Sequence, residues 1–359
     1  MTDSLYSSSA PVFKVDGQVE GSLARDLLRL EVEETTSGLK TLAARFLAVG
    51  PRAGAETEQL LYLDGAVLDF GKNLEVSLGP PGNERIVFTG AVSGLEARFD
   101  DGAEPEVVAL AEDKLMKLRM TRRSKTYEQM TDADIASAVA SEHGLTPSTG
   151  ADGPTYDLVQ QWNQSDLAFL RERAELVQAE LWCEGETLHF KTRGNRTGTS
   201  VTLIQGNELL SVECRADLAH QRTKVVVSGY DASARATIEQ ESGADAVQAE
   251  ISGGETGPAV LQRAFGDRAS TRVRETPLVD GEATAWAKAE MLRRSRGFVT
   301  TVGTTRGTPD LVVGSRVTLE RVGPPFNGEG YYVTRVRHTY DLDQGHRTRF
   351  EAERPTVSQ

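Results

Sequence analysis

Residues 326–338, Phe-Asn-Gly-Glu-Gly-Tyr-Tyr-Val-Thr-Arg-Val-Arg-His, decide how this chain is interpreted. Apolar and polar side chains alternate after the glycines, which indicates a half-buried strand entered from a tight turn. Residues 341–345 are short enough for a hairpin turn between strands at 331–340 and 346–354. Upstream, the Ala-rich segment 282–296 ends in arginines, which suit the end of a helix. A helix beside a returning antiparallel sheet predicts a small β-barrel.

The first hundred residues show the same strand-like alternation. Short amphipathic runs at 41–49, 74–78 and 85–97 have the period of an antiparallel sheet with one wet face. The turn-forming sequence Gly-Pro-Pro-Gly-Asn at 79–83 separates two of these runs. We therefore expect a first β-barrel over residues 1–105.

The pattern becomes mixed over residues 106–200. Thr131 is a good helix N-cap with Asp134 three positions on, and Ser165 caps a second amphipathic helix. Residues 181–191 are typical of a hairpin. These features predict an α/β insert domain between two barrels.

Strand-like sequence returns at 201, so the second barrel is expected over 201–359. Residues 231–280 are rich in Ala, Gly, Ser and Glu and poor in periodicity. This segment is predicted to be a variable, loop-like excursion with a short helix at 259–265. No sequence similarity between the first hundred residues and the C-terminal half is evident from these patterns.

Two ordered blocks carry a family resemblance. One is 265–354, and the other is 156–174, Tyr-Asp-Leu-Val-Gln-Gln-Trp-Asn-Gln-Ser-Asp-Leu-Ala-Phe-Leu-Arg-Glu-Arg-Ala, followed by Leu-Trp-Cys at 181–183 and Leu-His-Phe at 188–190. In this order they resemble the phage late control protein D family, the tail hubs of contractile phages. They are also similar to the N-terminal part of valine-glycine repeat protein G spikes. The resemblance implies an α+β, mainly β fold with two tail-tube-like antiparallel β-barrels and an α/β insert between them.

The resemblance implies a structural role in a contractile phage tail or a contractile injection system. Family hubs are homotrimers whose paired tube-like domains imitate six subunits, so that a sixfold inner tail tube can sit on a threefold spike. The sequence stops at Gln359, before the needle of the spike relatives, and so resembles a hub with a separate spike protein of the baseplate assembly protein V type. Other expected partners are the inner tail tube protein and further baseplate proteins. Cytoplasmic synthesis and residence in the baseplate are expected.

Composition excludes several other classes of protein. The chain has 40 Lys plus Arg against 53 Asp plus Glu, a net charge of −13 that opposes binding to nucleic acid. No run approaches the ~20 apolar residues of a membrane helix, so no membrane insertion is expected. Cys183 and Cys214 are too few for a disulfide framework and are expected to be small half-buried strand residues.

No catalytic, cofactor or metal site is predicted. The sequence has no His-Glu-x-x-His and no Gly-x-Ser-x-Gly, so neither zinc peptidase nor α/β-hydrolase chemistry is indicated. We therefore expect a non-enzymatic protein. The alternatives are a baseplate-associated cell-wall hydrolase, which needs converging carboxylates, and a carbohydrate-binding β-protein, which needs an aromatic platform that 6% aromatics barely provide.

Two aromatic residues are candidates for contact with a partner. Trp162 lies among Gln and Asn residues, although its ring could instead lie on the adjacent helix. Phe326 follows Gly-Pro-Pro in a loop, where it could face a neighbour or plug its own hairpin.

Overall fold

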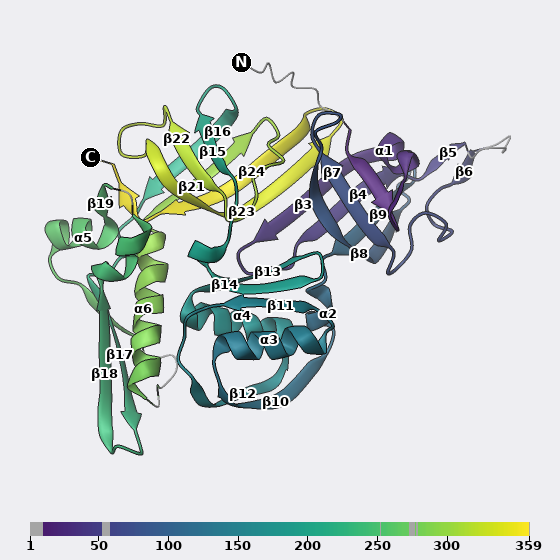
Figure 1. The fold of residues 1–359 in the computed structure, drawn as a ribbon. Coiled ribbons are helices and arrows are strands. Elements are labelled where there is room, and N and C mark those ends of the chain that lie inside the picture. Colours follow the sequence, from purple (N-terminus) through teal and green to yellow (C-terminus); the bar gives the residue numbers. More distant parts are fainter. Residues whose placement is uncertain (1–9, 52–57, 252, 273–276, 278, 359) are drawn as a thin grey trace.

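The computed structural model of the chain describes residues 10–51, 58–251, 253–272, 277 and 279–358. A 13-stranded sheet crosses the whole molecule, with a smaller α/β part and a long hairpin beside it (Figure 1). The prediction of a mainly β, α+β fold is confirmed.

The first module is the N-terminal half of the large sheet. Its strands follow the order β3-β4-β9-β8-β7-β1-β2 and are antiparallel throughout. Alternate residues face a core that includes Phe13, Phe46 and Phe88, and the short helix α1 buries Leu23 in the same core. The elements are β1 (Val12–Val15), β2 (Gln18–Val19), α1 (Gly21–Asp26), β3 (Leu27–Thr35), β4 (Thr41–Leu47), β7 (Asn73–Leu78), β8 (Arg85–Arg98) and β9 (Glu106–Glu112), with the separate pair β5 (Val49–Pro51) and β6 (Glu58–Leu60).

The second module is the C-terminal half of the sheet. Its strands follow the order β16-β21-β24-β23-β22-β15, and a bridge between Gln205 and Leu209 brings β15 back to β16. Tyr331 and Phe350 are fully buried in its core. The strands are β15 (Ser200–Ile204), β16 (Leu209–Ala216), β21 (Val299–Thr305), β22 (Arg316–Glu320), β23 (Gly328–Asp341) and β24 (Gly345–Arg354).

The insert lies between the two modules in sequence and packs two helices against small sheets. Its first long helix has the expected capping box, because Thr131 and Asp134 each accept from the other's backbone N–H. Ser165 caps the second by accepting from the Ala168 N–H at 3.2 Å. The elements are α2 (Met116–Arg119), β10 (Arg122–Met130), α3 (Asp132–Glu142), β11 (Thr146–Gly150), β12 (Tyr156–Ser165), α4 (Asp166–Val177), β13 (Ala179–Glu184), β14 (Thr187–Thr192) and η1 (Arg193–Asn195).

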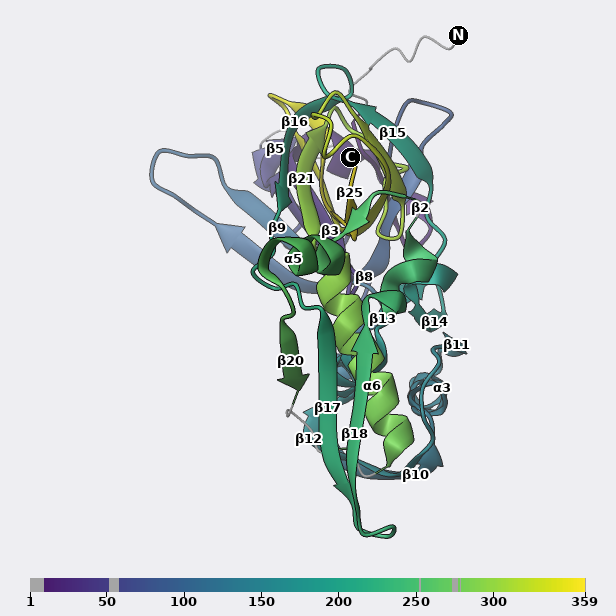
Figure 2. The same ribbon diagram turned by 90° about the vertical axis from the view of Figure 1, so that its left-hand side faces the viewer.

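The described residues of the segment 231–280 are more regular than expected, and the loop-like interpretation is wrong for much of 236–272. Residues 252, 273–276 and 278 lie outside the described residues. A hairpin of β17 and β18 projects beside α6 in both views (Figures 1 and 2). Its Val227 and Ile238 pack with Trp286 of α6 into the core of the insert. Few apolar residues suffice here because only one face of the hairpin is covered, which explains the weak periodicity. The elements are β17 (Lys224–Asp231), β18 (Ala236–Gly243), η2 (Ala244–Glu250), β19 (Glu255–Thr256), α5 (Gly257–Phe265), β20 (Ala269–Arg272), α6 (Asp280–Arg296) and β25 (Thr356–Val357).

The two modules repeat one another in topology. The order β3-β4-β9-β8-β7-β1 corresponds to β16-β21-β24-β23-β22-β15. The last strand differs in direction, because β1 is antiparallel to β7 and β15 is parallel to β22. The register shift after Leu27 in β3 recurs after Leu209 in β16. The shift after Val92 in β8 recurs after Val333 in β23. Since β-bulges are specific features of a strand pair, their coincidence indicates that the modules are copies of one plan.

A faint sequence repeat accompanies the structural one. Gly-Pro-Pro precedes β8 at 79–81 and precedes β23 at 323–325. With Val92 set against Val333, Phe-Asp at 99–100 falls on Tyr-Asp at 340–341 without a gap. The same alignment sets Ala-Glu at 111–112 on Ala-Glu at 352–353. These matches are too sparse to stand out before the strand register is known.

Candidate assembly site between the two modules

One strand joins the two modules into a single sheet. The first part of β23 pairs with β22 of its own module, and its later part pairs antiparallel with β3 of the first module. The register of this seam runs from Arg335 opposite Thr35 to Asp341 opposite Arg29. Because this antiparallel ladder runs over seven opposed residue pairs, its backbone hydrogen bonds hold the modules in one fixed relation.

Ion pairs cross the seam on the wet face of the sheet. Arg335 Nη2 lies 2.7 Å from Glu33 Oε1, and Arg337 Nε donates to Glu33 Oε2 at 2.7 Å. Arg337 Nε also lies 3.3 Å from Glu31 Oε1. Partial burial of Glu33 opposes its ionisation, but hydrogen bonds from both arginines hold its pKa below the usual value. These pairs are partly exposed, so they select the register more than they stabilise the fold.

A tyrosine crosses the seam on the apolar face. Tyr340 belongs to β23 of the second module but packs in the hydrophobic cluster of the first, opposite Leu30. Its side chain is 8% exposed. An aromatic ring of one module therefore completes the core of the other.

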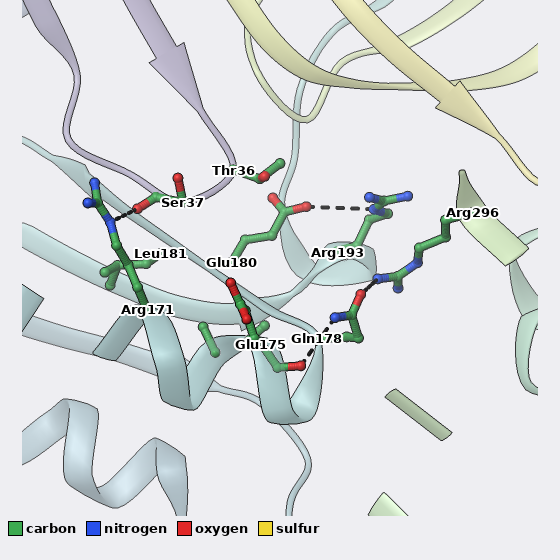
Figure 3. A pocket seen from close by; sticks show the side chains of 11 residues that line it. Thr36, Ser37, Arg171, Glu175, Gln178, Glu180, Leu181, Arg193 and Arg296 are labelled. Carbon is green, nitrogen blue, oxygen red and sulfur yellow. Dashed lines mark hydrogen bonds and ion pairs between the residues drawn. The ribbon is translucent and has the colours of Figure 1, made fainter. Parts of the chain in front are cut away.

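A buried carboxylate attaches the insert to the second module, and Figure 3 shows it beside Arg193. Glu180 on β13 is 5% exposed. It accepts a hydrogen bond from Tyr332 Oη at 2.6 Å and pairs with Arg196 Nη1 at 3.2 Å, with Arg193 Nε 3.6 Å away. Burial, together with the Glu180 carboxylate, raises the pKa of Tyr332 above its usual value.

The same arginines reach both β-modules. Arg196 Nη2 donates to Glu34 Oε1 of β3 at 2.6 Å. Arg193 pairs with Glu353 of β24, and its guanidinium lies 4.1 Å from the centre of the Tyr332 ring. The insert, the first module and the second module thus meet in one network of charges with little access to water.

A cavity of about 350 Å³ opens beside this network (Figure 3). Arg171 in its wall donates to the Ser37 carbonyl at 2.8 Å, and Arg296 donates to the Gln178 side chain at 3.1 Å. The arginines in its wall are thus engaged by acceptors of this chain. The cavity is therefore part of the junction between three parts of the protein.

A buried histidine pair lies beside the middle of the seam, where His338 is opposite Val32. His338 Nδ1 is 3.3 Å from His346 Nε2 and 3.0 Å from Thr348 Oγ1. Burial lowers the pKa of His338 well below its usual value, assisted by His346 and Lys40. Burial also lowers the pKa of His346 to about 4, assisted by the charge of Arg347.

Acidification is expected to destabilise the chain through this pair. Well above about pH 6.5 the rings are neutral in both states. As the pH falls through about 6.5 toward 4, the unfolded chain takes up protons before the folded one, so the free energy of unfolding decreases. The loss between pH 7 and pH 5 is about 2 kcal/mol from His346, with more in the same direction from His338. Urea unfolding at both pH values measures it.

Matched variants isolate the histidine contribution. His346→Gln should reduce the pH dependence, whereas replacing the exposed His220 by Gln should leave it as in the parent. Asp113, whose pKa burial raises to about 6, acts in the opposite direction in all three chains and cancels in the comparison. A His346→Gln chain with the parent's pH dependence would contradict this role.

The sequence-predicted contact residues lie far from the seam and in separate parts. The side chain of Trp162 on β12 is 68% exposed, and that of Leu158 on the same strand is 51% exposed. Phe326 is half-buried against the second module's core, and its carbonyl accepts from Tyr331 Oη at 2.8 Å. The two rings do not form a common surface.

Metal ligation, membrane crossing and the two cysteines were predicted from the sequence and can be compared with the described residues. Across 10–51, 58–251, 253–272, 277 and 279–358, no three or more His, Cys, Asp or Glu side chains are grouped to hold a metal ion. Within those same ranges, no helix combines the length and the apolar character needed to cross a membrane. Cys183 and Cys214 are half-buried free thiols on strands.

Two of the unpaired edges of the large sheet lie on equivalents of the strands that form the seam. Beyond the bridge between Gln205 and Leu209 at its start, β16 pairs among the described strands only with β21, so the rest of its outer edge is free. The part of β8 beyond Val92 pairs with β9 alone, because β7 reaches only as far as Ala91. Free edges are sites where another chain can add a strand. Sequence reasoning missed both edges, because only the repeat in topology reveals them.

The fold places the chain in a structural class. The prophage MuSo2 43 kDa tail protein from Shewanella oneidensis is similar with a TM-score of 0.70 and 15% identity, covering 96% of this chain and 98% of that one. The tail protein from Neisseria meningitidis MC58 gives 0.63 and 14%, with 97% of each chain covered. The E. coli c3393 protein, described as a type VI secretion component structurally similar to T4 tail proteins gp27 and gp5, gives 0.59 and 12%, covering 96% and 76%. The chain therefore has the fold of phage tail proteins.

The family follows from the sequence profile. The family model described as Alg8 N-terminal domain matches residues 54–341, most of the chain. The chain belongs to this family. A comparison with curated protein sequences finds no match.

Proposed function

We propose that the chain is a non-enzymatic hub of a contractile phage tail or a related injection system. The observation that carries the proposal is the repeat: two modules with the same strand order and two matching bulges share one sheet. A chain with two equivalent modules occupies two positions of a ring, so three copies present six. This arrangement would join a sixfold inner tail tube to a threefold spike. The resemblance to late control protein D proteins supports the same role.

The mechanism is mechanical. The seam, the crossing Tyr340 and the buried network at Glu180 fix three parts of the chain against one another. A rigid subunit transmits thrust from the tube to the spike without absorbing it in hinge motion. The expected partners are further copies of the chain, a tail tube protein, a spike protein of the baseplate assembly protein V type and other baseplate proteins. Exposed Trp162 and half-buried Phe326 are proposed contacts for such partners.

Native mass spectrometry of the purified chain tests the proposal. A particle of three 38.9 kDa chains that binds a sixfold ring of the tube protein from the same source is expected. The parallel assay is clearance of peptidoglycan. A monomer that clears peptidoglycan would replace the hub by a baseplate-associated hydrolase.

A further inference from the structure

The repeat identifies the strands that join one copy to the next. Within the chain, β23 of the second module pairs with β3 of the first. The topological equivalents of these strands are β8 of the first module and β16 of the second, and both have a free edge where the seam would form. We propose that β8 of one copy pairs antiparallel with β16 of a second copy and that three such seams close the ring. This inference rests on the proposed function.

The two free edges cannot meet within one copy. In the order of the sheet, β16 is the first strand of the second module, and β8 lies beyond β3, β4 and β9 of the first. The far end of the β8–β9 hairpin projects from the body of the molecule (Figure 2). A second copy can supply the missing neighbour. Its β16 would extend the sheet beside β8, as β3 extends it beside β23 within the chain.

The shared bulges transfer the register without adjustment. On the β8 side, Val92 corresponds to Val333, so each later residue corresponds in turn. On the β16 side, Leu209 corresponds to Leu27. Applying the pairing of β23 with β3 then predicts these opposite residues between copies: Leu95 and Ala216, Glu96 and Arg215, Ala97 and Cys214, Arg98 and Glu213, Phe99 and Val212.

The charges that meet in this register are complementary. Glu96 falls opposite Arg215, and Arg98 falls opposite Glu213. The corresponding pair inside the chain, Arg337 and Glu33, has its signs the other way round. Topological equivalence alone does not require opposite charges to meet, so their coincidence is an independent argument for the register. In a single copy Glu96 and Arg98 are exposed and pair with one another at 2.8 Å.

The apolar residues of the predicted seam are also matched. Phe99 is 60% exposed in a single copy, yet its counterpart Tyr340 is buried in the neighbouring module's core. Val212, opposite Phe99, is partly buried and packs against the core of the second module. Cys214 is also partly buried and packs against the same core. Phe99 of one copy would thus complete the core of the next copy's second module as Tyr340 completes that of the first.

A disulfide with the native Cys214 tests the register directly. Residues opposite one another in an antiparallel pair have Cα atoms roughly 4.5–5.5 Å apart, within the range that a disulfide spans. The variant Ala97→Cys, treated with diamide as oxidant, is expected to form covalent dimers and trimers on a non-reducing gel, and a reductant should reverse them. The matched controls are Ala103→Cys in the same exposed hairpin, and Ala97→Cys combined with Cys214→Ala. Neither control should be crosslinked above the parent level.

Native mass spectrometry of the same samples separates the inference from the proposed function. A trimer that crosslinks only through positions 97 and 214 supports both. A trimer with no crosslink above the controls would contradict the β8–β16 seam but would remain consistent with the proposed trimeric hub. A chain that stays monomeric at all concentrations overturns both. Charge reversal adds a second readout: Arg215→Glu should lower trimer formation at least tenfold, and adding Glu96→Arg should restore it.

Discussion

The variant Phe99→Ala is expected to fold like the parent and to lose the ring. In a single copy the Phe99 side chain is 60% exposed, so its removal costs the isolated subunit little. In the proposed ring the same side chain is buried in the next copy, where truncating an aromatic anchor costs about 2 kcal/mol or more. Because a ring contains three such seams, the association constant should fall roughly 10⁴-fold. Sedimentation at several concentrations measures the loss.

Phe70→Ala is the matched control for this variant. Phe70 belongs to the same module and is 66% exposed, but it lies in the loop before β7 and outside the predicted seam. Its replacement should leave the trimer intact. If both variants form the parent trimer, Phe99 is not at the interface; if both dissociate it, the interface lies elsewhere on the first module.

Much of the fold is predictable from local sequence because the decisive signals are local. Caps such as Thr131 and Ser165, the hairpin turn at 341–345 and the alternation along β8 depend only on residues near one another in the chain. The excursion at 231–280 was harder to predict. Its hairpin buries one face against α6 and the insert, so its apolar residues are few and belong to a distant core.

The candidate site was not predictable in the same way. Trp162 and Phe326 were selected because they are aromatic residues in polar or loop-forming surroundings. By contrast, the pairing of strands far apart in the chain is what identifies Phe99, Glu96 and Arg215 as candidate interface residues. The signal that would have found them is the alignment of Val92 with Val333 and of Phe99 with Tyr340. Short matches of this kind depend on knowing where each strand is bulged.

The seam also explains why the proposed interface combines weak and strong interactions. Partly exposed ion pairs such as Arg335 with Glu33 contribute little free energy, but they penalise a change of register. A one-residue slip would turn every apolar side chain to water, and a two-residue slip of the proposed seam would set Glu96 opposite Glu213 or Arg98 opposite Arg215. The buried aromatic side chain supplies the stability that the ion pairs lack. The ion pairs on the solvent-exposed face thus select the register, and the aromatic side chain on the apolar face supplies the affinity. Together they allow the subunits to associate in one register only.

The variant Glu180→Ala is expected to lower the free energy of unfolding by about 3 kcal/mol, because removing one partner of a buried ion pair leaves uncompensated charge. Arg193 and Arg196 each keep one other carboxylate, Glu353 and Glu34, which limits the loss to this lower end of the usual range. Urea unfolding followed by circular dichroism measures it as a lower midpoint with an unchanged slope.

Glu184→Ala is the control for the network at Glu180. Glu184 lies on the same strand, β13, and its side chain is 71% exposed, so its loss should change stability by less than about 0.5 kcal/mol. Glu180→Gln should fall between the two, since an amide can still accept from Tyr332 Oη at the 2.6 Å position but leaves the arginines without its charge. Equal stability of Glu180→Ala and Glu184→Ala would show that the three parts of the chain are held together by their apolar contacts alone. In that case the buried charges would select the docking geometry of the insert without stabilising it, and the rigidity invoked for thrust would have to come from the β23–β3 seam.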